Sequence, residues 1–134
     1  MSTDALVSIV TPAYKATRFV ADTIRSVQAQ TYANWEMIIV DDCSPDDTCA
    51  VVEQFSKKDP RVRLIRQQKN GGPAMARDMA LMNANGRYIA FLDSDDLWLP
   101  TKLQHQLRFW KALVLRCHLH AFEEFRKLQM HAAD

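Results

Sequence analysis

Ile89-Ala90-Phe91-Leu92-Asp93-Ser94-Asp95-Asp96 is an apolar run that leads directly into three carboxylates, two of them spaced Asp-x-Asp. The apolar part predicts a buried strand, with the acids at its carboxyl end. Three neighbouring carboxylates repel one another unless a positive group lies among them. A hard divalent ion such as Mg²⁺ or Mn²⁺, which bridges protein carboxylates to substrate phosphates, fits that need. A loop whose acids cap the next helix is the alternative, and this stretch alone leaves both interpretations open.

The rest of the chain repeats the pattern of an apolar strand followed by an amphipathic helix. The predicted strands are 6–11, 35–40, 62–65 and 88–92. The predicted helices lie within 19–27, from 44 onward with Ser44 as N-cap, from 73 to a stop near Gly86, and from 100 onward. Continuous apolar strands that alternate with helices predict an α/β fold, with a mainly parallel sheet covered by helices on both faces.

Ligands of such sheets bind outside the carboxyl ends of the strands. The polar or ring-bearing residues that follow the four predicted strands are Thr11, Tyr14, Asp41, Asp42, Asn70, Arg77, Asp93 and Asp95. All four strand ends meet at one edge of the sheet, so we expect these side chains to gather there. Their chemistry suits a nucleotide diphosphate. Asp46 and Asp47 are interpreted instead as acids that cap a helix.

Composition limits the class of protein. A chain of 134 residues with 48% hydrophobic and 25% charged residues predicts one soluble domain. The net charge of +1 gives no field that would draw the chain onto nucleic acid, so no nucleic-acid partner is expected. Apolar runs are too short to span a bilayer, and the start does not read as a signal peptide, so we expect a cytoplasmic location. Cys43 and Cys49 are interpreted as packing residues.

The end of the chain differs from the rest because it contains no Gly or Pro after Pro100. An apolar face continues at spacings of three or four from Leu103 to Leu128, as one long helix or two. We therefore divide the chain into residues 1–112 and a helical tail, 113–134. An apolar stripe that outruns its own domain must bury against something, so we expect a homodimer through the C-terminal helix.

Four motifs in this order resemble the nucleotide-binding half of family 2 glycosyltransferases with the A-type fold. The motifs are Val7–Tyr14 (VSIVTPAY), Ile38–Thr48 (IIVDDCSPDDT), Asn70–Arg77 (NGGPAMAR) and Phe91–Asp96 (FLDSDD). The resemblance covers about residues 5–112. It implies a Rossmann-like nucleotide-diphospho-sugar transferase fold, which would be incomplete here at its C-terminus, and an enzyme of cell envelope polysaccharide biosynthesis.

The resemblance also implies roles for single residues. Thr11, Pro12 and Tyr14 would line the pocket for the base, with the Tyr14 ring packed on it. Asp41 would accept a hydrogen bond from the base, and Arg77 would meet the donor near its diphosphate. Asp93 would bind the ribose or assist the metal, and Asp95 would be the direct ligand of Mg²⁺ or Mn²⁺.

The implied function is metal-dependent transfer of a sugar from a UDP-sugar donor to an acceptor, with inversion of the anomeric centre. The acceptor would be a saccharide or a lipid-linked molecule, and the latter would bring the protein to a membrane as a peripheral protein. The family's general base lies on a later segment, which has no counterpart in this chain. The alternative is therefore a fragment that binds the nucleotide sugar without turnover.

Three residues depart from the family's common pattern. Lys15 stands where Asn is common, Cys43 where Gly is common, and Asp78 where Asn is common. We expect these changes to alter donor preference or local packing and to leave the metal site intact. A phosphoacceptor receiver domain is disfavoured because its acid pair should follow the first strand, which here ends in Thr11-Pro12.

Overall fold

The computed structural model describes residues 5–116, with side chains as far as Trp110. Strands and helices alternate in the predicted βαβαβαβα order. They are β1 Val7–Ala13, α1 Val20–Gln28, β2 Trp35–Asp41, α2 Thr48–Lys58, β3 Val62–Arg66, α3 Pro73–Met82, β4 Tyr88–Phe91 and α4 Lys102–Arg116. The predicted α/β class is confirmed.

The described strands form one parallel sheet in the order β3-β2-β1-β4. The chain builds outward from β1 through β2 to β3, and then crosses back to place β4 on the other side of β1. The order therefore reverses between β1 and β4. In open parallel sheets, a crevice forms at such a switch point outside the carboxyl ends of the two strands. The acids after β4 and the Thr11–Tyr14 segment, in which β1 ends, both lie at this point.

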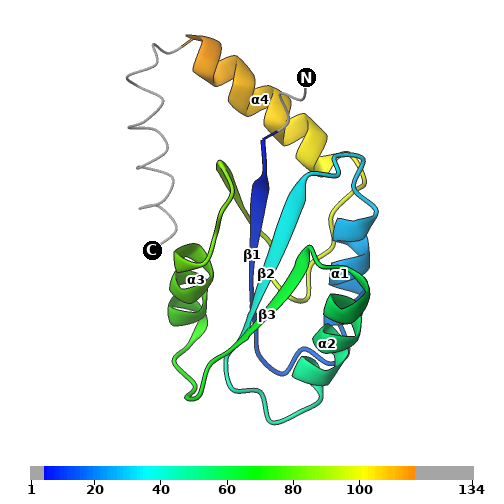
Figure 1. Ribbon diagram of the computed structural model, residues 1–134, viewed down its shortest axis with the longest axis vertical. Helices are drawn as coiled ribbons and strands as arrows, with labels where there is room; N and C mark the ends of the chain where they lie inside the picture. The colour runs from blue at the N-terminus through cyan, green and yellow to red at the C-terminus, as the bar shows by residue number, and fades with distance from the viewer. Residues whose placement is uncertain (1–4, 117–134) are drawn as a thin grey trace.

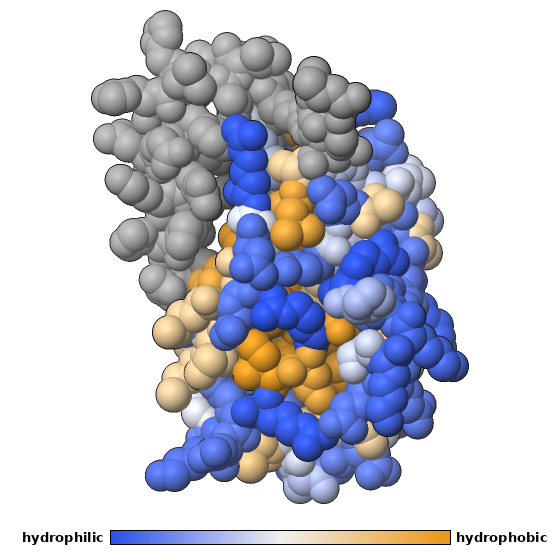
Figure 2. Space-filling view, in the orientation of Figure 1, coloured by the Kyte–Doolittle hydropathy of each residue, from blue (hydrophilic) through white to orange (hydrophobic). Residues whose placement is uncertain are grey.

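Alternate residues of the strands build two separate cores, because successive side chains of a strand point to opposite faces. On one face, Ile9 and Met37 pack with α1, α2 and α4 in the larger cluster. On the other face, Val10 and Ile38 pack against Ala76 and its neighbours in α3. Figure 1 shows this division, with α3 on one side of the sheet and α1 and α2 on the other. Figure 2 shows hydrophobic surface over the sheet between α3 and α2, bordered by hydrophilic side chains.

A buried polar cluster lies on the α3 side, centred on Glu36 of β2. The Ser8 hydroxyl donates to Glu36 Oε1 at 2.8 Å, and the Asn85 amide donates to the same oxygen at 2.8 Å. Arg63 pairs with Oε2 at 3.4 Å. Burial raises the pKa of Glu36, but the hydrogen bonds from Asn85 and Ser8 and the charge of Arg63 outweigh it, so the pKa lies below its ordinary value. The cluster joins three strands to the α3–β4 loop.

Two boundary predictions were wrong. The second helix begins at Thr48 and not near Ser44, because the Ser44 amide donates to Asp41 and its hydroxyl accepts from Lys15. Gly86 does not stop α3, which ends at Met82. A Cβ on Gly86 would come within 2.6 Å of the Ser8 amide nitrogen, so this glycine allows the close approach of the loop to β1.

The helix-cap interpretation of the two acids before α2 is confirmed for one of them. Asp46 accepts from the Thr48 amide at 3.1 Å, whereas Asp47 makes no capping hydrogen bond. The division predicted at residue 112 falls inside α4, and residues 117–134 lie outside the described residues. The division and the homodimer through the C-terminal helix therefore stay predictions. Among the described residues, no helix has the length and apolar character needed to cross a bilayer.

Candidate functional site

The acids after β4 form a tight turn at the switch point. The Leu92 amide donates to Val10 of β1 at 3.1 Å, and the Asp96 amide donates to the Asp93 carbonyl at 3.1 Å, which closes the turn. All three carboxylates are exposed, and an oxygen from each of Asp93, Asp95 and Asp96 lies within 4.8 Å of the others. Three convergent carboxylate oxygens are a donor set that suits Mg²⁺ or Mn²⁺. The predicted ligands Asp93 and Asp95 are thus brought together, and Asp96 joins them.

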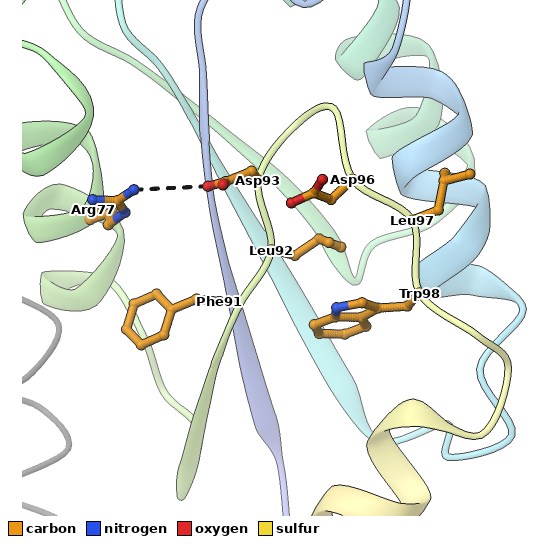
Figure 3. Close-up of a pocket in the computed structure, with 7 residues that line it drawn as sticks. All are labelled: Arg77, Phe91, Leu92, Asp93, Asp96, Leu97 and Trp98. Atoms are coloured by element: carbon orange, nitrogen blue, oxygen red, sulfur yellow. Dashed lines mark ion pairs between the residues drawn. The ribbon is translucent and has the colours of Figure 1, made fainter.

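Arg77 faces this acidic turn from α3. Its guanidinium lies 3.8 Å from an oxygen of Asp93, and both side chains are partly exposed. Figure 3 shows Arg77 reaching across from α3 toward Asp93. A surface pair of this kind contributes little to stability. It does, however, place a fixed positive charge beside the carboxylates, where an anionic ligand would arrive.

Two hollows flank the turn. We call the first the Tyr14 hollow; it has a volume of about 460 Å³. It contains five of the predicted site residues: Pro12, Tyr14, Arg77, Asp93 and Asp95. Its other lining residues are Ala13, Lys15, Ala16, Phe19, Asp42, Asn70, Gly72, Pro73, Ala76 and Ser94. The Tyr14 side chain is 44% exposed, so its ring is available to a ligand.

Asp42 builds one wall of the Tyr14 hollow. Its carboxylate accepts from the amides of Gly71 and Gly72 at 2.7 and 2.8 Å, and its own amide donates to Ala13 at 2.9 Å. Gly72 has a φ of 90°, which a residue with a side chain rarely adopts. The carboxylate thus fixes the glycine turn that opens α3 and so sets the start of the helix that carries Arg77. The sequence placed Asp42 at this edge without predicting its partners.

Thr11 and Asp41 do not line either hollow. Both are buried, with 0% and 2% of their surface exposed. Thr11 Oγ1 and Asp41 Oδ1 have no hydrogen-bond partner among the described residues, although Asp41 Oδ2 accepts from Ser44. Buried oxygens without a hydrogen-bond partner are uncommon in proteins, and a ligand from outside the chain can supply the missing partner. Burial, together with the neighbouring Asp41, raises the pKa of the Cys49 thiol to about 11, which supports the interpretation of Cys49 as a packing residue.

We call the second hollow the Trp98 hollow; it also has a volume of about 460 Å³. It shares Arg77 and Asp93 with the first, and Figure 3 shows Phe91, Leu92 and Trp98 below the two carboxylates. Its lining residues are Arg77, Phe91, Leu92, Asp93, Asp96, Leu97 and Trp98. An aromatic floor beneath acidic residues suits a ligand that has both an apolar face and hydroxyl groups. The sequence reasoning did not assign Trp98 to the site.

Comparison with known proteins identifies the group to which this arrangement belongs. The family model described as glycosyl transferase family 2 matches residues 8–123. The chain belongs to glycosyl transferase family 2. The resemblance inferred from the four motifs is therefore confirmed.

Curated members of the family are similar to most of this chain. The putative teichuronic acid biosynthesis glycosyltransferase TuaG of Bacillus subtilis is 50% identical over 104 residues, which cover 78% of this chain and 41% of TuaG. The Escherichia coli protein WfgD, named as a UDP-Glc:α-D-GlcNAc-diphosphoundecaprenol β-1,3-glucosyltransferase, is 48% identical over 104 residues, covering 78% of this chain and 40% of WfgD. The chain thus spans about two fifths of the length of these relatives.

Solved structures of other proteins share the fold. The structure of S. aureus TarS in complex with UDP superposes with a TM-score of 0.74 at 29% identity, covering 79% of this chain and 32% of that one. The mannosyltransferase PcManGT from Pyrobaculum calidifontis, in complex with GDP-Man and Mn²⁺, superposes with a TM-score of 0.66 at 26% identity, covering 70% of this chain and 28% of that one.

Proposed function

We propose that this chain binds a UDP-sugar together with a divalent cation and takes part in transfer of the sugar to an acceptor hydroxyl. The observation that carries the proposal is the position of the acidic turn. Asp93 lies between two hollows at the topological switch point, one suited to a nucleotide and the other to a sugar. The UDP complex of TarS and the UDP-glucose donor in the name of WfgD support the choice of nucleotide.

The nucleotide end would occupy the Tyr14 hollow. The exposed ring of Tyr14 and the adjacent Pro12 offer a flat apolar surface for the base. Asp41 Oδ1 and Thr11 Oγ1 are buried without partners among the described residues and do not line this hollow, so a base would reach them only if the loops after β1 and β2 moved. A carboxylate accepts hydrogen bonds only, which matches the N–H of a uracil ring.

The diphosphate would lie at the acidic turn. Asp93, Asp95 and Asp96 would hold Mg²⁺ or Mn²⁺, and Arg77 would contribute its positive charge beside them. When bound, such a cation acts as a Lewis acid that offsets the negative charge growing on the leaving phosphate. Arg77 acts in the same direction, because its guanidinium places a positive charge beside the carboxylates.

The sugar and the incoming hydroxyl would meet in the Trp98 hollow. Phe91 and Trp98 offer aromatic surface, and Asp96 can accept hydrogen bonds from hydroxyl groups. Inversion by a single displacement requires a general base on the side of the sugar opposite the leaving group. No residue in 5–116 is assigned to that role, and binding without turnover is therefore kept as the alternative.

The name of WfgD includes a lipid-linked acceptor, and we therefore propose a saccharide on a lipid carrier as the acceptor for this chain. Such an acceptor would bring the protein to the membrane surface as a peripheral protein. The cytoplasmic location stays a prediction.

Calorimetric titration of UDP into the protein, with and without Mn²⁺, tests the donor site. We expect binding that depends on Mn²⁺ and that weakens by about tenfold or more in Asp95→Asn. Asp47→Asn is the control, because Asp47 is exposed, makes no capping bond and lies outside both hollows. Absence of UDP binding, or binding that Asp95→Asn leaves unchanged, would contradict the proposal. Incubation of a UDP-sugar with a saccharide acceptor then separates transfer from binding alone.

A further inference from the structure

One side of the first helix holds the whole segment that follows the acidic turn. Thr23 and Ser26 in α1, and Gln30 just beyond its end, recur at helical spacing. The Ser26 hydroxyl accepts from the Trp98 amide at 3.3 Å. The Gln30 amide donates to Leu99 at 2.7 Å, and its carbonyl accepts from Leu103 at 3.0 Å. These side chains fasten backbone that is more than sixty residues away in sequence.

Thr23 is the member of this row that reaches the acids. It is fully buried, and its hydroxyl oxygen lies 2.9 Å from the Ser94 carbonyl and 2.8 Å from the Asp96 carbonyl. These two carbonyls flank Asp95 on either side. The third acceptor within reach, the carbonyl of Phe19 at the N-cap of α1, is more distant at 3.2 Å. A hydroxyl carries one proton, so the two turn carbonyls share it.

The turn needs this attachment to α1 because the repulsion between its own negative charges favours a more open conformation. Three carboxylates that meet within 4.8 Å repel one another in the absence of a cation. Leu92 ties the entrance of the turn to β1, and Asp96 closes it on Asp93. Thr23 is the described side chain that fastens the middle and the exit of the turn to a helix. Without it, the turn could open and separate the carboxylates.

We propose that Thr23 is a positioning residue for the divalent-cation site, acting through the carbonyl groups of Ser94 and Asp96. Its hydroxyl keeps Asp95 beside Asp93 and Asp96 before the cation arrives. The proposal rests on the metal site of the proposed function. Thr23 itself would touch neither the nucleotide nor the cation. Its helix, α1, lies outside all four sequence motifs.

The test is the affinity of the purified protein for Mn²⁺ alone, measured by calorimetry and by the electron paramagnetic resonance signal of free Mn²⁺. Thr23→Val removes the hydroxyl and keeps the shape, and we expect the dissociation constant to rise about tenfold. Thr23→Ser keeps the hydroxyl, and we expect an affinity near that of the wild type. Thr31→Val is the control, because the Thr31 hydroxyl also bonds to this segment, at Gln104, but both residues lie outside the two hollows.

Each outcome decides the proposal. A loss in Thr23→Val that Thr23→Ser restores and Thr31→Val does not share would support it. Unchanged affinity in Thr23→Val, beside a loss in Asp95→Asn, would overturn this proposal and leave the metal site intact. Absence of Mn²⁺ binding by the wild-type protein would overturn both. If Thr23→Val does not fold, Thr23→Ala carries the same expectation, because it removes the hydroxyl without placing a methyl group against the carbonyls.

Discussion

Two residues beside the Tyr14 hollow adopt a backbone conformation that their side chains oppose. Lys15 and Cys43 have φ values of 50° and 59°, in the left-handed region where Gly, Asn and Asp are at ease. Both positions are among the three at which the sequence departs from the family's common pattern. Asn is common at the position of Lys15, and Gly is common at the position of Cys43. The effect on local packing that these departures were expected to have is therefore backbone strain in the two loops that follow β1 and β2.

Cys43→Gly should stabilise the protein. Removing Cβ relieves the left-handed strain, and the added freedom of glycine in the unfolded chain offsets part of the gain, which leaves about 0.5–1 kcal/mol. The free energy of unfolding in urea measures it. Cys43→Ala is the control, since it keeps Cβ and removes only the weak contact from the thiol to Gln68 at 3.6 Å. A glycine variant no more stable than the alanine variant would show that the loop is not strained.

Single residues also show the limit of sequence reasoning about the site. The acids at the strand ends could be predicted, because the strand pattern itself places them at one edge. The roles of Asp42 and Thr23 could not, because they depend on partners 29 to 73 positions away in sequence. Nothing in a local pattern shows that a buried threonine on a helix faces the carbonyls of a distant turn.

At the scale of the elements, the apolar runs located the four strands to within one or two residues, because a buried strand needs continuous apolar side chains on both faces. The start of α2 was misplaced, since Ser44 can either cap a helix or form a turn, and a local bond to Asp41 together with a long-range bond from Lys15 selects the turn. The Glu36 cluster was missed entirely. One acid within an apolar strand gives no sign of the donors that will surround it.

Glu36→Gln should weaken the junction of the strands with the α3–β4 loop. The Glu36 carboxylate accepts from Ser8, Asn85 and Arg63, and an amide would turn a donor toward one of them. We expect a loss of roughly 1.5–3 kcal/mol in unfolding free energy at neutral pH. Urea unfolding of both proteins measures it.

The difference between wild type and Glu36→Gln should depend on pH. The folded-state pKa of Glu36 lies below its ordinary value of 4.5, so its stabilising contribution is complete above that pH and is lost as the pH falls through the folded-state pKa. The gap between the two proteins should therefore narrow in acid. Asp22→Asn, which alters an exposed ion pair with Arg25, should change stability by less than about 0.5 kcal/mol. A gap that stays constant down to about pH 3 would contradict the assigned cause.

For the whole molecule, the arrangement of the site matters more than any one contact. The Tyr14 hollow is walled by the end of β1, the loop after β2, the glycine turn before α3 and the acidic turn after β4. These segments are spread over more than eighty residues, and the sheet order alone brings them together. A ligand that touches all of them cannot bind an unfolded chain, so its binding free energy adds to the stability of the domain as a unit.

UDP and Mn²⁺ together should therefore raise the melting temperature of the protein in one cooperative transition. UDP at a hundred times its dissociation constant adds about 2.7 kcal/mol, which corresponds to a rise of roughly 10 °C for a domain of this size. Because the cation would join the acidic turn to the diphosphate, each ligand should strengthen the effect of the other. UMP, which has a single phosphate, should show much less of this mutual effect, and Asp95→Asn should abolish it. Equal shifts with UDP and UMP would mean that the nucleotide binds without engaging the carboxylates, and the acidic turn would then have to serve another ligand.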